Sequence, residues 1–86
     1  MELDVKITYK NDRLQAVRQA AGLSQSQLAN ASGISVRVLQ DYERGARNLN
    51  GAKLSTLLKL CLVLKCKLSE IITDSETSKL LEAYNG

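Results

Sequence analysis

Hydrogen-bonding side chains are concentrated between residues 35 and 44, in the segment SVRVLQDYER. Arg37 carries a planar fork of donors that matches the O6 and N7 acceptors of guanine, and the amide of Gln40 supplies a donor and an acceptor that suit adenine. Val36 can lie against a thymine methyl group, and the hydroxyl of Ser35 can either contact a base or cap a helix. These residue types suit the reading of base edges, provided that one rigid element presents them together.

The same inventory gives little support to catalysis. The chain has no His and only two Cys, so neither a zinc site nor a histidine-based catalytic centre can be assembled. Cys61 and Cys66 lie about 140° apart around a helix, so we expect them to point in different directions, with Cys61 filling the core. Cys66 is either a small apolar residue near a helix end or a redox-active thiol. We expect no enzymatic activity, no metal and no cofactor.

Two short helices joined by a tight turn are indicated by residues 25–44. Ala29 is small where the helices would cross closely, Gly33 lies where the turn needs a positive φ, and Leu39 is apolar where the second helix must face inward. The other positions that match helix-turn-helix spacing are Leu28, Ile34 and Tyr42.

Capping patterns predict the helix boundaries. Asp12 and Ser24 each precede a Gln by three residues, which is a capping box, and so start the first and second helices. Ser35 caps a third helix over 36–44, which Gly45 ends. Further helices are expected over 52–64, near 68–72 and from 74 or 75 onwards, with a surface loop over 45–51 and an extended arm, an edge strand or disorder at 5–9.

Through the motifs LSQSQLA, GISVRVLQDYERG and LLKLCLVLKCKLSEII, residues 11–73 resemble the phage-repressor-like (Xre/Cro/CI-type) DNA-binding family. The resemblance implies an all-α fold, a five-helix lambda-repressor-like helix-turn-helix bundle. An N-terminal arm over 1–10 precedes this domain, and a C-terminal helix or tail over 74–86 follows it. The third helix then enters the major groove of double-stranded DNA while the second helix braces it.

This geometry and the resemblance divide the candidate contacts into two groups. Base contacts are expected from the exposed, N-terminal side of the third helix, at Ser35, Val36, Arg37, Gln40 and Asp41. Phosphate contacts are expected from Gln25, which matches a family position with that role, and from the side chains clustered after the third helix, Arg44, Arg47, Asn48 and Lys53.

Two acidic residues of the third helix need separate treatment. Asp41 would be repelled by phosphate unless it accepts from cytosine N4 or pairs with Arg37 or Arg44, and both alternatives stay open. For Glu43, the resemblance implies an internal ion pair with Arg18 that fixes the angle between the first and third helices. Breaking a buried pair of this kind costs about 3 to 5 kcal/mol.

Eighty-six residues allow one small domain, and 44% hydrophobic residues without Pro, Trp or Phe suit an aliphatic helical core. Residues 1–73 carry a net charge of +5 and residues 74–86 carry −2, so a basic body is followed by an acidic tail. A basic body fits a phosphate-facing surface without proving one. No secretory leader is apparent, and no run approaches the ~20 apolar residues of a membrane span, so we expect a cytoplasmic protein without membrane contacts.

The helix over 52–64 carries more apolar surface than one core needs. Beyond the inward stripe of Leu57, Leu60, Cys61 and Leu64, it has Leu58, Leu62 and Val63. Such patches on small domains usually mark contacts. We expect a homodimer formed by the last two helices and part of this patch, because two-fold pairing doubles the DNA site. The alternative is that the last helix or the N-terminal arm covers the patch within one chain.

The function expected from these features is a sequence-specific DNA-binding transcriptional regulator, a repressor, that acts by occupying DNA. One alternative is an antitoxin, or a controller-type protein resembling the small controllers of restriction-modification systems, that also binds a partner protein. Another is a degenerate helix-turn-helix module kept for protein contacts, which the acidic Asp41 permits.

Overall fold

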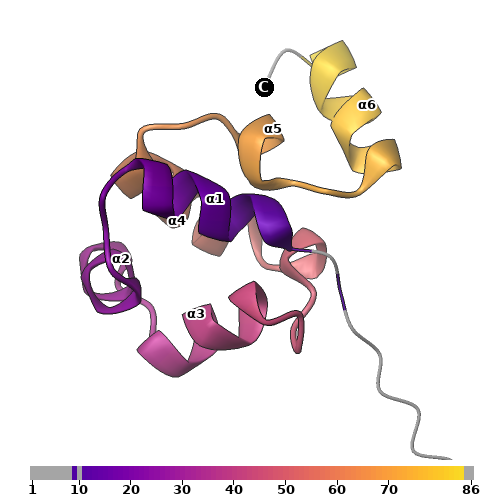
Figure 1. Cartoon of the computed structure of the whole chain (residues 1–86). Helices are drawn as coiled ribbons and strands as arrows, with labels where there is room; N and C mark the ends of the chain where they lie inside the picture. Colours follow the sequence, from indigo (N-terminus) through magenta and orange to yellow (C-terminus); the bar gives the residue numbers. More distant parts are fainter. Residues whose placement is uncertain (1–8, 10, 85–86) are drawn as a thin grey trace, which may run out of the picture.

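Helices make up most of the computed structural model, which describes Tyr9 and residues 11–84 (Figure 1). Within these residues there is no strand, which confirms the predicted all-α bundle. Only Tyr9 of the expected arm is described, and its N–H donates to the carbonyl of Gly45 over 2.9 Å. The elements are α1 (Asp12–Ala20), α2 (Gln25–Ser32), α3 (Val36–Glu43), the 3-10 turn η1 (Leu49–Gly51), α4 (Leu54–Leu64), α5 (Leu68–Ile71) and α6 (Ser75–Tyr84).

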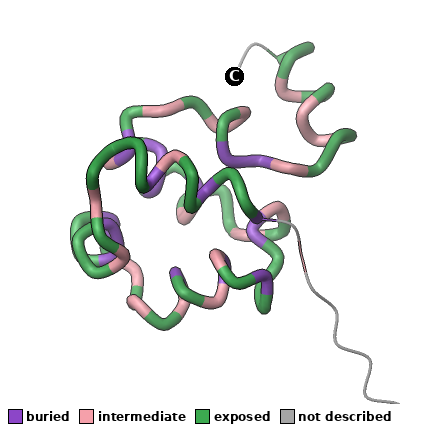
Figure 2. Tube along the Cα trace, in the orientation of Figure 1, coloured by how far each residue is buried: buried purple, intermediate pink, exposed green. Residues whose placement is uncertain are grey.

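The core is aliphatic and receives one fully buried leucine from each of the first four helices, namely Leu14, Leu28, Leu39 and Leu60. Burying a leucine side chain contributes about 1.5 to 3 kcal/mol, so this layer holds α1 to α4 together. The predicted inward stripe of α4 is buried as expected. Figure 2 shows the buried segments turned towards the space that the helices enclose.

Local sequence signals set the ends of α2 and α3. The capping box predicted at Ser24 is present, since the Gln27 N–H donates to Ser24 Oγ over 3.0 Å and Gln27 Oε1 accepts from the Ser24 N–H over 2.8 Å. Ser35 caps α3 through the Val38 N–H. Gly33 closes α2 in the left-handed conformation, with φ +71°, as the turn required.

Two local predictions are wrong. The N-cap of α1 is Asn11, not Asp12, and its side chain makes no capping bond. The Asn11 amide instead donates to the carbonyls of Tyr42 and Arg47, so it ties the start of α1 to the end of α3. The segment 45–51 is also not wholly a surface loop, because η1 turns the apolar Leu49 inward until it is fully buried.

α4 ends at Leu64, where the sequence predicted its end. Lys65 is left-handed, with φ +55° and ψ +46°, and the Cys66 N–H then donates to the carbonyl of Cys61 over 3.1 Å. This sixth-to-first bond defines a Schellman motif, which folds the chain back over the last turn of the helix. The two thiols then lie close enough for each to shift the pKa of the other. The prediction that the two cysteines point apart is therefore wrong, because it assumed that the helix continued through Cys66.

The C-terminal helix is joined to the rest by its linker. Asn50 of η1 accepts from the N–H groups of Thr73 and Asp74. Asp74 in turn caps α6, and hydrogen bonds from Thr77 hold the pKa of its carboxyl below the usual value. α6 packs against α5, yet none of its residues is fully buried. None of the described helices is long and apolar enough to cross a membrane.

Candidate nucleic-acid interface

The predicted helix-turn-helix positions pack α2 against α3. Ala29 and Leu39 are fully buried and Tyr42 is nearly so, while Ile34 lies half-buried beside them. The close crossing that the small Ala29 side chain permits fixes α3 relative to α2. The opposite face of α3 remains available to solvent.

An ion pair predicted between α1 and α3 is present. The Arg18 guanidinium donates to Glu43 through two parallel bonds of 2.7 and 2.9 Å, and its remaining nitrogen donates to the carbonyl of Leu23 over 2.8 Å. The two side chains are only 10% and 4% exposed. Hydrogen bonding to Glu43 raises the pKa of Arg18 above its ordinary value. The arginine is therefore structural and is not available to DNA.

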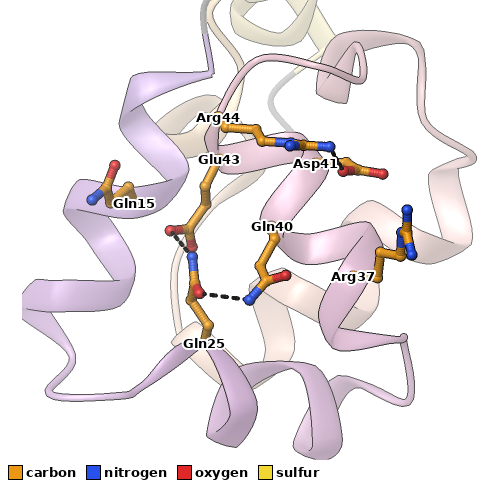
Figure 3. A pocket seen from close by; sticks show the side chains of 7 residues that line it. All are labelled: Gln15, Gln25, Arg37, Gln40, Asp41, Glu43 and Arg44. Atoms are coloured by element: carbon orange, nitrogen blue, oxygen red, sulfur yellow. Dashed lines mark hydrogen bonds and ion pairs between the residues drawn. The ribbon is translucent and has the colours of Figure 1, made fainter.

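A relay of side-chain amides continues from this ion pair to the surface, and the sequence did not indicate it (Figure 3). Gln25 at the start of α2 donates from Nε2 to Glu43 over 3.1 Å. Its Oε1 accepts from Gln40 Nε2 over 3.3 Å. A carboxylate only accepts hydrogen bonds, so the Gln25 amide must turn its nitrogen towards Glu43 and its oxygen towards Gln40. The relay thus orients Gln40 from a buried anchor.

Asp41 forms the local pair that was one of its two predicted alternatives. Its carboxylate accepts from Arg44 over 2.7 Å, and Arg47 lies at 3.7 Å. The aspartate side chain is 16% exposed, whereas the two arginines are more than half exposed. Arg37, the other predicted partner, forms no ion pair with any described residue. Asp41 therefore holds two cations at the rim of α3 while Arg37 stays free.

The structure gathers part of the predicted set around one open cleft of about 550 Å³. Its lining includes the exposed Arg37 and Gln40 together with Gln25, Asp41, Glu43 and Arg44. Gln15 of α1 lines it too, although its sequence position indicated only a capping role. The cleft is open and polar, as a surface that meets a hydrated polyanion should be.

Other predicted contacts lie outside this cleft or are already engaged. The Ser35 hydroxyl accepts from the Val38 N–H as a cap, and Val36 is half-buried against the core. Asn48 caps η1 by accepting from the Asn50 N–H over 3.1 Å. Lys53 is exposed at the start of α4. Sequence spacing alone could not distinguish side chains that are free to contact DNA from side chains that already cap a helix.

Comparison with known proteins places this geometry in a family. A profile of the helix-turn-helix family HTH_3 matches residues 14–71, which is most of the chain. Among solved structures, the restriction-modification controller protein C.AhdI from Aeromonas hydrophila is 37% identical over 72% of this chain and 89% of its own, with a TM-score of 0.64.

The chain is also similar to a structure described as a SinR protein/SinI protein complex, at 25% identity over 87% of this chain and 77% of that one, with a TM-score of 0.66. No match was found among curated proteins. The profile match confirms the family expected from the sequence motifs. The chain thus belongs to the helix-turn-helix family HTH_3, of the Xre/Cro/CI type, and is a DNA-binding regulator.

Proposed function

We propose that this regulator binds operator DNA sequence-specifically, as a repressor, by inserting α3 into the major groove. The observation that carries the proposal is the contrast between exposed and anchored side chains in the cleft at α3. Arg37 and Gln40 are exposed there, while Glu43, which lines the same cleft, is fixed by a buried ion pair. A rigid helix that presents free base-reading side chains is what direct readout requires.

We assign base readout first to Arg37 and Gln40. Arg37 has a free guanidinium fork suited to guanine. Gln40 donates one N–H to Gln25, which leaves its second N–H and its oxygen for adenine. Ser35 and Val36 lie at the same end of α3, and we assign them smaller roles. Ser35 caps the helix and borders the groove, and Val36 makes an apolar contact with a thymine methyl group.

We assign phosphate contacts to Arg44, Arg47, Asn48 and Lys53, and to the remaining N–H of the Gln25 amide. Asp41 belongs with this group as a positioning residue. Because its charge is balanced by Arg44, the carboxylate does not oppose the approach of a phosphate. Cytosine readout by Asp41 would require that pair to open, so we favour the positioning role.

Selection of bound duplexes from a random pool, with wild-type protein and two arginine variants, tests these assignments. Arg37→Ala should lose preference at one base position, by about 1 to 3 kcal/mol of discrimination. Arg47→Ala is the matched control, and it should weaken all sequences about equally and lower the salt slope by about 1. Retained preference in Arg37→Ala would refute groove reading by this residue.

We further propose that the regulator is a homodimer of the controller type, for which the 37% identity to C.AhdI gives support. The chain has an apolar groove of about 700 Å³, built mostly from α4 and the turn that follows it, with further residues from α5 and α6. Leu62 and Tyr84 in it are 78% and 83% exposed, so α6 covers the groove only in part, through the half-buried Leu81. The groove is lined by Leu54, Leu58, Cys61, Leu62, Lys65, Cys66, Lys67, Leu68, Leu81 and Tyr84.

Charge favours a second copy as the occupant of this groove. Lys65 and Lys67 stand at the groove, and α6 carries the exposed carboxylates of Glu76 and Glu82. Two-fold pairing that buries the leucines of both chains would bring the lysines of one chain near the acidic helix of the other. The same pairing would also present two copies of α3 to one duplex.

Sedimentation at micromolar concentration tests the dimer with a matched pair of variants. Leu62→Lys places a charge in the groove and should weaken self-association by about tenfold or more, or ~1.4 kcal/mol. Leu80→Lys makes the same change at an exposed leucine of α6 that does not line the groove, and should leave association unchanged. A wild-type protein that stays monomeric would refute the dimer and leave the DNA-binding proposal intact.

A further inference from the structure

The two cysteines of the chain meet at the end of α4. Both are free thiols, Cys61 buried and Cys66 half-buried, and no other cysteine occurs in the sequence. They occupy the first and sixth positions of the Schellman motif, whose side chains commonly touch. The bond from the Cys66 N–H to the Cys61 carbonyl, at 3.1 Å, fixes the backbone that brings the thiols together.

The environment of the pair distinguishes the two sulfurs. Burial, followed by the neighbouring Cys66, raises the pKa of the Cys61 thiol to about 12. Burial also raises the pKa of Cys66, but there the neighbouring Cys61 thiol acts in the opposite direction. Cys66 is also the more exposed of the two at the groove. Cys66 is therefore the thiol that attacks first, and Cys61, which lies beside it, is the resolving thiol.

We propose that Cys61 and Cys66 form a thiol–disulfide exchange site, which closes reversibly into an intramolecular disulfide on reaction with a small-molecule disulfide. The Cys66 thiolate attacks one sulfur of the small disulfide, giving a mixed disulfide and releasing one thiolate. Cys61 then loses its proton and attacks the Cys66 sulfur, which releases the second thiolate. The protein loses two protons and two electrons, and the small disulfide is reduced to two thiols.

A closed disulfide would lock the turn that ends α4 and would remove both thiols from the apolar groove. The proposal depends on the geometry of one chain and not on DNA binding; because both thiols line the groove assigned to a second copy, exchange is expected in the dissociated chain. The proposal also gives a chemical role to two thiols that take no part in the proposed base and phosphate contacts.

Equilibration of the full chain in glutathione redox buffers, followed by acid quenching, alkylation and intact mass measurement, tests the proposal. The wild type should convert to a monomer that takes up no alkyl group and carries no glutathione. The same titration in urea removes the Schellman geometry. We expect the disulfide to be favoured about tenfold or more in buffer relative to urea, a shift of ~30 mV for a two-electron couple.

Two variants test the order of attack. Cys61→Ala keeps the attacking thiol and should stop at the mixed disulfide with glutathione, whereas Cys66→Ala should stay largely unmodified. Equal disulfide stability in buffer and urea would overturn the proposal, as would covalent dimers or a persistent mixed disulfide in the wild type. Because the comparison between buffer and urea uses only the wild type, it decides the matter even if a variant fails to fold.

Discussion

The helix-turn-helix half of the molecule, α1 to α3, carries a connected set of polar side chains, whereas the half formed by α4 to α6 exposes several large apolar side chains. In the first half, Glu43 accepts hydrogen bonds from Arg18 and Gln25, and Gln25 accepts one from Gln40. In the second half, Leu54 and Leu62 are 62% and 78% exposed along one helix. The polar side chains around α3 are thus held within one chain, while the leucines of α4 are exposed to solvent, where we propose that a second copy covers them.

The two surfaces lie on opposite sides of the molecule. Figure 1 shows α3 on one side of α1 and α4, with α5 and α6 on the other. A dimer contact at the apolar groove would therefore leave the exposed face of α3 uncovered. This arrangement allows the two halves to be disturbed one at a time.

The largest expected effect is the loss of DNA affinity as the salt concentration rises, which tests the half formed by α1 to α3. If a dimer makes six to ten phosphate contacts, DNA affinity should fall by about 10³ to 10⁵ between about 50 and 200 mM salt, because each contact releases counterions. Fluorescence polarisation with a labelled operator measures this. Leu80→Lys, on α6 outside the groove, is a useful control, since it should keep the wild-type slope. A flat salt response would contradict phosphate binding by α3 and its neighbours.

The next effect concerns the anchor of the reading helix. Glu43→Gln leaves the buried Arg18 charge without a carboxylate and should lower the free energy of unfolding by about 3 to 5 kcal/mol. Urea denaturation followed by circular dichroism measures the loss. Glu76→Gln makes the same change at an exposed position of α6 and should stay within about 0.5 kcal/mol of wild type. Equal losses in both variants would mean that the ion pair does not fix α1 to α3.

Sequence reasoning succeeded where a short-range signal sets the structure. The cap at Ser24, the left-handed turn at Gly33 and the inward leucines of α4 each depend on neighbours within one or two turns. The Arg18–Glu43 pair came from the family resemblance, since the two residues lie 25 positions apart and no spacing rule joins them. The fold could therefore be predicted more fully than the site.

The wrong or missed predictions share a physical cause. In each case a side chain that a local pattern assigned to one role makes a contact with a distant part of the fold instead. Asn11 took the cap position predicted for Asp12 because its amide binds the carbonyls of Tyr42 and Arg47 across the fold. Leu49 lies among turn-forming residues, but tertiary packing buries it. The relay through Gln25 was missed because a side chain assigned to phosphate is first satisfied within the protein. Such choices depend on distant neighbours that one sequence does not reveal.

The smallest effect belongs to the apolar half, at the turn that ends α4. Lys65 is the sole non-glycine residue with a positive φ among the described residues, and a left-handed side chain is strained there. Lys65→Gly should raise the free energy of unfolding by about 0.5 to 1 kcal/mol, because relief of that strain exceeds the extra entropy of the unfolded glycine chain. Urea denaturation measures the change.

Lys67→Gly is the matched control, since Lys67 lies two residues further on with φ −87°. The same substitution relieves no strain there and should not raise stability, because the freedom that glycine adds to the unfolded chain offsets its suitability at the N-cap of α5. DNA affinity at constant salt should stay unchanged in both variants when it is measured at protein concentrations that keep the proposed dimer associated, because both lysines stand at the groove assigned to the second copy. Equal destabilisation by the two substitutions would show that the left-handed residue at the end of α4 carries no strain, and a loss of DNA affinity would show that the two surfaces are coupled.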